Sequence, residues 1–558
     1  MATYYLDPAA AGSGDGTTTG LTGAHCAFKT WAEAYAGAPT VSDTLAVKRG
    51  TVLREQAKIP WYGTSSTPFT ITDYSTGNLP AICGADLVGT WSVHDGNIYS
   101  ATCTTEPHIV IFDGTVGTNQ ATHDDCTANG DWNWTSNVLY CFCDAGDPDT
   151  VYTDPGIEAG TARWCFYTDY VTRNYISISN FRVYGFDGSP GIHIYRSNGW
   201  TLDTVTIEKC ARTGIHNQES SGLTVTDSTL TGVRTLASAW RGIYNYSSNP
   251  TYPVSNITIH DTDVTNWTGY AIDVAGYSYS YPSYNLSVYN CDLSHSSSGL
   301  YIGHVDGVSA HDITMDDNLS GTNCPDQEEY GLATSEVQNA DFYNLTITNG
   351  RTGYEMWSQV GNPSYPLHGA SHNIKFHHSK IDTMTEHGIL NHTGDAHGVE
   401  IYRNWILNCY YGGITGNDAD AASTDFTIRH NSLYNNNTGD KGYADIYFGS
   451  TNAGYTIINN AVFAVTTYAF RSGNNATQCT HRHNCWWRAS GNIIDDHGTT
   501  YTAATGATWE TDGAVFDNPD FINTGAGTED LGLQSSSPCI DVGEDVGDDS
   551  DYYGNPIV

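Results

Sequence analysis

Residues 374–389 read IKFHHSKIDTMTEHGI. The first three residues alternate apolar, polar and apolar, which is the period of a strand that buries one face. His378 follows two positions later, where we expect a turn, and Gly388-Ile389 opens a second strand. This unit recurs from about residue 170 onward, so it determines the expected fold.

The first strand of the unit recurs with the same alternation. It appears as Ile176-Ser-Ile178, Val205-Thr-Ile207, Leu223-Thr-Val225, Ile257-Thr-Ile259, Leu286-Ser-Val288, Ile313-Thr-Met315, Leu345-Thr-Ile347, Val399-Glu-Ile401, Phe426-Thr-Ile428 and Tyr455-Thr-Ile457. Two positions beyond the last apolar residue stand Asn180, Asp227, Asp261, Asn290, Asp317, Asn349 and Asn459. Short polar side chains favour turns, so we interpret this series as a structural ladder.

The second strand begins at a Gly-Ile-like pair in most units, such as Gly191-Ile192, Gly214-Ile215, Gly242-Ile243, Gly299-Leu300 and Gly413-Ile414. Successive pairs are 22 to 35 residues apart, which is typical of a solenoid whose loops vary in length. One coil cannot bury its apolar face alone. The sequence therefore predicts an all-β fold, a right-handed parallel β-helix that forms one cooperative stack.

The ends of a solenoid need caps because an open coil exposes unpaired strand edges. Residues 28–35 have helical spacing and predict an N-terminal capping helix, and the period fades near residue 476, which predicts an irregular C-terminal lid. We expect a cap with the first coils over 1–165, a regular β-helix over 166–475 and a C-terminal capping segment over 476–558.

The net charge of −39 excludes several partners. Such a field repels nucleic acids and anionic membranes, and no stretch is apolar enough to span a bilayer. The first residues lack the features of a signal peptide. Among 14 cysteines, Cys126, Cys141, Cys143 and Cys165 lie close together in sequence, and one or two disulfides are expected there if the protein is exported.

The two ends carry a resemblance to a known family. The opening Tyr4-Tyr5-Leu6-Asp7-Pro8, the stretch from Asp43 to Arg54, and the closing Ser537-Pro-Cys-Ile-Asp541 are similar to members of the pectin-lyase-like superfamily, including phage tailspike-type depolymerases. The resemblance implies the β-helix fold and a polysaccharide substrate. It leaves the reaction open, because the superfamily includes hydrolases, lyases and epimerases.

We expect an extracellular or virion-associated enzyme, monomeric or homotrimeric, that cleaves a polysaccharide internally. Hydrolysis is preferred to β-elimination, because few Lys or Arg fall where a uronate polymer would bind. The alternatives are a polysaccharide lyase and a non-catalytic glycan-binding or phage tail protein.

The residue after each inward Ile should face outward. This column reads His193, His216, Tyr244, Asp273, Tyr301, Ala333, Glu355, Leu390, Thr415, Tyr447 and Arg471, and a second column two residues on includes Tyr195, Gln218, Tyr246, Trp357 and His392. We predict catalytic roles for Asp273, Glu355, His392 and the loop acid Glu329. We predict substrate binding by Tyr244, Tyr246, Tyr301, Trp357 and His216.

Spacing constrains these roles. Asp273 and Glu355 are three coils apart, about 14 Å, which is too far for a direct carboxylate pair. Glu355 and His392 should be about 8 Å apart, with water or sugar between them.

No cofactor is expected to be required. The histidines between His368 and His397 fit no zinc motif, so no metal site is predicted there. Calcium binding by Asp-rich turns stays open, for example at Asp418 and Asp420 or at Glu544, Asp545, Asp548 and Asp549.

Overall fold

The computed structural model describes residues 1–37, 41–160, 164–236, 239–278, 280–318, 329–357, 370–392, 396–416, 424–449, 454–473 and 479–547. Contacts divide these residues into two compact units. The first holds Met1–Asp273, and the second holds the described residues from Val274 onward. Each unit is built from long parallel sheets, as in a right-handed parallel β-helix, which confirms the predicted fold.

In the first unit, one sheet collects the strands with alternating apolar residues. It contains β1 (Thr3–Leu6), β2 (Thr44–Lys48), β3 (Val52–Leu53), β5 (Phe69–Tyr74), β6 (Ala81–Cys83), β17 (Ile176–Tyr184), β19 (Thr201–Glu208), β21 (Thr224–Thr226), β22 (Thr229–Thr231) and β24 (Ser255–Thr265). A second sheet carries the Gly-Ile strands. It contains β4 (Ala57–Lys58), β16 (Phe166–Tyr167), β18 (Ile192–Tyr195), β20 (Ile215–Gln218) and β23 (Arg241–Tyr246), while β25 (Tyr270–Ala275) lies at the boundary between the units.

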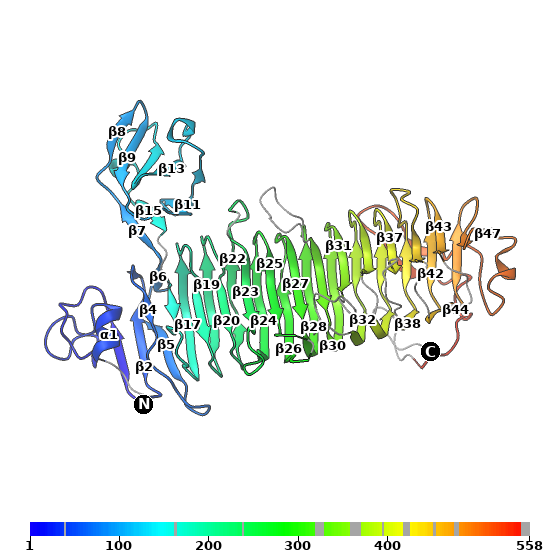
Figure 1. Ribbon diagram of the computed structural model, residues 1–558, viewed down its shortest axis with the longest axis horizontal. Coiled ribbons are helices and arrows are strands. Elements are labelled where there is room, and N and C mark those ends of the chain that lie inside the picture. The colour runs from blue at the N-terminus through cyan, green and yellow to red at the C-terminus, as the bar shows by residue number, and fades with distance from the viewer. Residues whose placement is uncertain are drawn as a thin grey trace. The chain divides into compact units, whose positions relative to one another are not determined.

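The second unit repeats this arrangement, and Figure 1 shows its strands as successive parallel arrows. The first sheet contains β26 (Ser283–Asp292), β28 (Val305–Asp316), β30 (Gln338–Thr348), β32 (Ser371–His377), β33 (Lys380–Asp382), β35 (Ala396–Tyr402), β36 (Trp405–Leu407), β38 (Thr424–Arg429), β39 (Ser432–Tyr434), β41 (Tyr455–Ile458), β42 (Ala461–Ala464), β44 (Cys479–Arg482) and β45 (Cys485–Arg488). The second contains β27 (Ser298–Gly303), β29 (Tyr330–Ser335), β31 (Thr352–Trp357), β34 (His387–Asn391), β37 (Gly412–Gly416), β40 (Ala444–Phe448), β43 (Tyr468–Ser472), β46 (Ile494–Asp496) and β47 (Thr499–Tyr501).

The expected turn residues adopt left-handed backbone conformations, with φ between 48° and 59°, at Asn180, Asp227, Asp261, Asn290, Asp317, Asn349, His378 and Asn459. They lie at two turns of the coil and not at one, because Met315 before Asp317 pairs with Ile347 before Asn349, whereas Phe376 before His378 pairs with Phe342. Asn and Asp tolerate this region, which explains their recurrence at the turn. A second ladder was not predicted: buried amides bond from coil to coil through Asn404, Asn431, Asn460 and Asn484.

The alignment of the repeat was wrong at three places. Ile207 pairs with Val183 and Leu230, whereas Val225 pairs with Leu202. Similarly, Ile313 pairs with Cys291 and not with Leu286, and Ile374 pairs with Ala340 and not with Leu345. The reason is that β19, β28 and β30 each continue through a turn and supply two apolar segments, so the sequence pattern has two equally good registers there.

A module of antiparallel strands interrupts the first unit between residues 85 and 160. One sheet joins β7 (Ala85–Val88), β15 (Ile157–Gly160), β10 (Val110–Phe112) and β11 (Thr115–Val116), and another joins β8 (Ser92–Asp95), β9 (Ile98–Thr102), β14 (Val138–Phe142), β13 (Asp131–Thr135) and β12 (Thr118–Asn119). Its core includes Trp132, Leu139 and Cys141. The sequence predicted first coils here and gave no sign of this module, which lacks the repeat.

The predicted capping helix is α1 (Trp31–Gly37), with Trp31 and Ala34 buried. At the other end, parallel pairing continues through β44, β45 and β46, and is followed by an antiparallel pair of β48 (Phe521–Asn523) with β49 (Asp530–Leu533). A disulfide joins Cys485 to Cys539 in this segment.

The early cysteines differ from the expectation, since Cys126, Cys141 and Cys143 are buried free thiols. None of the helices in the described part of the chain is both long enough and apolar enough to cross a bilayer.

Candidate functional site

The outward columns have the predicted register. In the first unit His193 pairs with His216, which pairs with Tyr244. In the second unit the column runs through Tyr301, Ala333, Glu355, Leu390, Thr415, Tyr447 and Arg471. The predicted site residues therefore fall into two groups, one in each unit.

In the second unit, Glu355 is bound directly by two neighbours. Its Oε1 accepts a hydrogen bond of 2.5 Å from Trp357 Nε1, and it also bonds His392 Nδ1. The carboxylate is only 3% exposed, whereas the His392 side chain is 42% exposed. The expected water or sugar between Glu355 and His392 is thus absent, because two long side chains span the separation of their strand positions. Glu355 acts as the buried partner, and His392 presents the second ring nitrogen, Nε2.

The hydrogen bond that His392 donates to Glu355 raises the pKa of His392 above its ordinary value of 6.5. Burial and the positive charge of Arg351 act in the opposite direction. A carboxylate that accepts from one ring nitrogen stabilises the imidazolium and fixes the ring. His392 is therefore suited to proton transfer near neutral pH, with its indole neighbour Trp357 at a ring-centroid distance of 5.2 Å.

A second ion pair borders this dyad. Arg351 Nε lies 3.0 Å from Glu386 Oε2, and both side chains are partly exposed. Burial is the largest single influence on the pKa of Arg351 and lowers it. The hydrogen bond to Glu386 and the charges of Glu386 and Glu329 together outweigh burial, so the pKa of Arg351 is raised. The predicted loop acid Glu329 also accepts a backbone hydrogen bond of 3.2 Å from Thr352. Three carboxylates, one guanidinium and one imidazole thus belong to this region.

Aromatic side chains continue beside the ion pair. His387 Nδ1 lies 2.9 Å from Thr415 Oγ1, and its ring is edge-on to those of Tyr411 and Tyr443 at 5.2 and 4.9 Å. Burial lowers the pKa of His387 to about 3, so this histidine is neutral. Tyr301, predicted to hold sugar, is partly exposed on the same column as Glu355.

Sequence reasoning missed Arg351, Glu386, His387 and Tyr411. All four precede the Gly or Gly-Ile position from which the columns were counted. A charged or aromatic residue one or two positions before the glycine of successive units is the signal that could have identified them.

In the first unit, Asp273 is held by a partner that the sequence did not reveal. Its Oδ2 lies 2.5 Å from Arg241 Nε, and the residue is 3% exposed. Arg241 itself lies over the rings of Trp240 and Tyr244, at 3.9 and 4.2 Å from their centroids. Burial raises the pKa of Asp273, and Arg241 partly opposes this effect. The geometry favours a structural role for Asp273, because a guanidinium does not exchange protons near neutral pH.

The three predicted binding residues of the first unit form one stack. Tyr244 lies between His216, with ring centroids 4.9 Å apart, and Tyr246, at 5.3 Å, while Arg241 also covers it. Burial lowers the pKa of His216 to about 3. Because these neighbours already pack against the ring of Tyr244, the ring is poorly placed to stack on a sugar.

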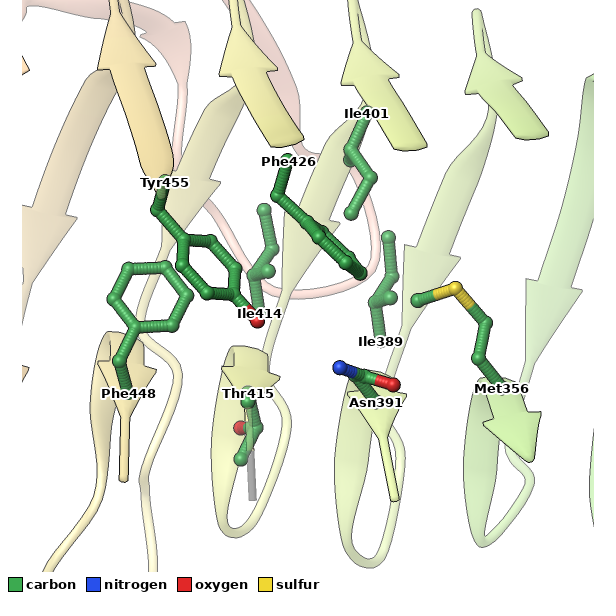
Figure 2. A pocket seen from close by; sticks show the side chains of 10 residues that line it. Met356, Ile389, Asn391, Ile401, Ile414, Thr415, Phe426, Phe448 and Tyr455 are labelled. Carbon is green, nitrogen blue, oxygen red and sulfur yellow. The ribbon is translucent and has the colours of Figure 1, made fainter. Parts of the chain in front are cut away.

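One interior pocket of the second unit is too small for a substrate. Figure 2 shows a small pocket within the second unit, lined mainly by apolar side chains that include Met356, Ile389, Ile414 and Phe448. Its volume of about 10 Å³ is that of roughly one water molecule. This pocket therefore cannot hold a sugar ring.

Within the described residues, no group of three or more His, Cys, Asp or Glu side chains could hold a metal ion. Glu544 pairs with Arg482, and Asp545 caps the backbone of Gly547. Asp418, Asp420, Asp548, Asp549 and His368 lie outside the described residues, so calcium binding there stays a prediction.

Comparison with solved structures supports the fold. A structure of XylC in complex with xylose matches with a TM-score of 0.50 and 14% identity, over 94% of this chain and 88% of that one. A glycoside hydrolase matches with a TM-score of 0.40 and 10% identity (87% and 96% covered), and the A-module of the Azotobacter vinelandii mannuronan C-5 epimerase AlgE4 with 0.40 and 12% (62% and 88% covered). No protein-family model and no curated protein sequence matches the chain. At these identities the likeness establishes the parallel β-helix alone. The reaction has to be inferred from the geometry of the site.

Proposed function

We propose that this chain is a polysaccharide-degrading enzyme that hydrolyses glycosidic bonds within the polymer, with His392 as its general acid. The observation that carries the proposal is the Glu355–His392 pair, in which a buried carboxylate holds a partly exposed imidazole and raises its pKa. A group that is protonated near neutral pH and fixed on a rigid sheet meets the requirements of a general acid.

In this mechanism the Nε2–H of His392 protonates the glycosidic oxygen as the bond to the anomeric carbon breaks. A carboxylate on the other side of the sugar removes a proton from the attacking water, whose oxygen bonds to that carbon. Glu329 and Glu386, the carboxylates beside Arg351, are the candidates for this base. Trp357 supplies an aromatic contact for the sugar, and Tyr301 extends the column along which the polymer would lie.

The alternative is β-elimination from a uronate polymer. One observation favours it: Arg351 is a cation within electrostatic reach of His392, and a cation is needed to neutralise a uronate carboxylate. In that reaction His392 would act in its neutral form as a base. Because Glu386 already neutralises Arg351, hydrolysis is the better match.

The test is incubation with a panel of soluble neutral and acidic polysaccharides, followed by product mass and ultraviolet absorbance. Hydrolysis adds one water to each pair of products, whereas elimination adds none and creates an absorbing double bond. The His392→Asn variant should be inactive in either case. Absence of any cleavage across the panel would favour a non-catalytic glycan-binding body.

A further inference from the structure

We infer that the first unit carries a separate binding platform for neutral polysaccharide, centred on Tyr170. This inference is independent of the proposed reaction, because every residue that carries it lies between Met1 and Asp273. The residues concerned are Tyr170, Trp164, Tyr195, Arg196 and Tyr252.

Tyr170 combines high exposure with a fixed position. Its side chain belongs to a residue that is 58% exposed. Its ring nevertheless packs edge-to-face against three others, at centroid distances of 5.2 Å from His193, 5.2 Å from Tyr195 and 5.9 Å from Trp164. Tyr170 is thus held by three rings while much of its surface stays in solvent.

The backbone at this point is strained. Tyr170 and the preceding Asp169 both have left-handed conformations, with φ of 55° and 53°. Non-glycine residues adopt this region at a cost in free energy, and a bulky aromatic residue does so rarely. The ion pair between Asp169 Oδ2 and Lys58 Nζ, 2.6 Å apart, anchors the turn. The turn therefore holds the aromatic ring outward against the preference of its backbone.

Further rings extend the platform. Trp164 is partly exposed and lies 4.4 Å from the buried His193, measured between ring centroids. On the other side, the guanidinium of Arg196 lies between Tyr195 and Tyr252, at 4.8 and 4.3 Å from their centroids. Tyr252 is itself 39% exposed. Sugar rings bind to such surfaces through their C–H faces, with hydroxyl groups directed to nearby polar atoms.

The charges indicate a neutral ligand. Among the described residues of the platform, Lys58 is paired with Asp169, and Arg196 Nε is 2.5 Å from Glu219 Oε2. Both cations are thus neutralised locally within a chain of net charge −39. Polyanions would be repelled by the whole molecule, and Lys58 and Arg196 are already paired with carboxylates. A neutral hexose or pentose polymer meets neither obstacle.

The experiment measures binding by affinity gel electrophoresis with soluble xylan, mixed-linkage glucan, galactomannan and, as the anionic probe, polygalacturonate. The full chain carries His392→Asn so that cleavage does not remove the probe. Tyr170→Asn is the main variant, because Asn tolerates the left-handed backbone and only the ring is lost. We expect binding of at least one neutral polymer to weaken by roughly 3- to 10-fold, the range for losing one aromatic contact.

Two control variants sharpen the result. Tyr170→Phe keeps the ring and should bind like the parent, and Tyr281→Ala removes a tyrosine of similar exposure, 51%, from the second unit without effect. Unchanged binding in Tyr170→Asn, equal losses in the Asn and Phe variants, or preference for polygalacturonate would each overturn the inference. Tyr170-dependent binding by a chain that cleaves nothing would contradict the proposed reaction and leave the platform intact.

Discussion

Asp273 and Glu355 were predicted at equivalent outward positions of the Gly-Ile strands, and each is 3% exposed. Their partners differ. Asp273 bonds Arg241, which aromatic rings cover, whereas Glu355 bonds His392, which is partly exposed. A guanidinium keeps its proton at all ordinary pH values, while an imidazole exchanges its proton near neutrality. The same position in the coil thus carries a carboxylate paired with a covered guanidinium in one unit and a carboxylate paired with a partly exposed imidazole in the other.

The largest expected effect separates the two pairs by activity. His392→Asn removes the exposed proton donor and should lower turnover by about 10²- to 10⁴-fold, the usual contribution of general acid–base catalysis. Asp273→Asn, compared at equal concentration of folded protein, should change turnover by less than about 10-fold, below the general acid–base range. Initial rates on a cleaved polysaccharide measure both. A collapse of activity in folded Asp273→Asn would restore this residue to the catalytic set.

How much of this comparison the sequence could predict depends on the kind of contact. The outward columns follow from strand alternation, which is a local property, and they have the predicted register. The turn residues such as Asn290 were also predictable, since backbone conformation selects Asn or Asp there. Fold and column order are therefore encoded within single coils.

The partners were not predictable in the same way. Arg241 bonds Asp273 from a residue 32 positions earlier, and His392 bonds Glu355 from 37 positions later. Such contacts depend on side-chain reach between coils, which alternation does not specify. The antiparallel module around Trp132 was missed because it has no repeat to recognise.

The next effect is on stability. Asp273→Asn leaves the charged Arg241 without its buried carboxylate and should lower the free energy of unfolding by about 3–5 kcal/mol. Glu355→Gln should cost only about 1 kcal/mol, because His392 can lose its proton when its partner is gone. Urea unfolding at neutral pH measures both variants. Equal losses would show that the two pairs are energetically alike.

Acid should destabilise both units through buried neutral histidines. Burial lowers the pKa of His193 to about 4, and that of His216 and His387 to about 3. Since these folded-state values lie below the unfolded value of about 6.5, the stability that they contribute is present above pH 6.5 and is lost as pH falls toward 4 and 3. The expected loss is about 1–3 kcal/mol for each histidine. The opposite sign holds for His392, whose raised pKa adds stability at low pH.

Unfolding midpoints at pH 7 and pH 4.5 test this, with His216→Asn as the comparison variant. That variant should have a smaller difference between the two midpoints than the parent. An identical difference would mean that His216 takes up a proton as readily in the folded protein as in the unfolded one. Its stacking on Tyr244 would then need another explanation.

The smallest effect is the most informative about the reaction. The hydrogen bond that His392 donates to Glu355 raises the pKa of His392, so Glu355→Gln should lower that pKa. If His392 is the general acid of a hydrolase, activity requires its protonated form, and the rate falls as pH rises through this pKa. In Glu355→Gln the falling limb then moves to lower pH. If His392 is instead the base of an elimination, the rate falls as pH decreases, and the acidic limb moves to lower pH.

Profiles of kcat/KM against pH for parent and variant distinguish these cases, because a shift of the alkaline limb supports hydrolysis and a shift of the acidic limb supports elimination. Profiles that coincide would mean that the Glu355–His392 pair does not titrate during catalysis. The Glu355–His392 and Asp273–Arg241 pairs would then not differ in proton exchange.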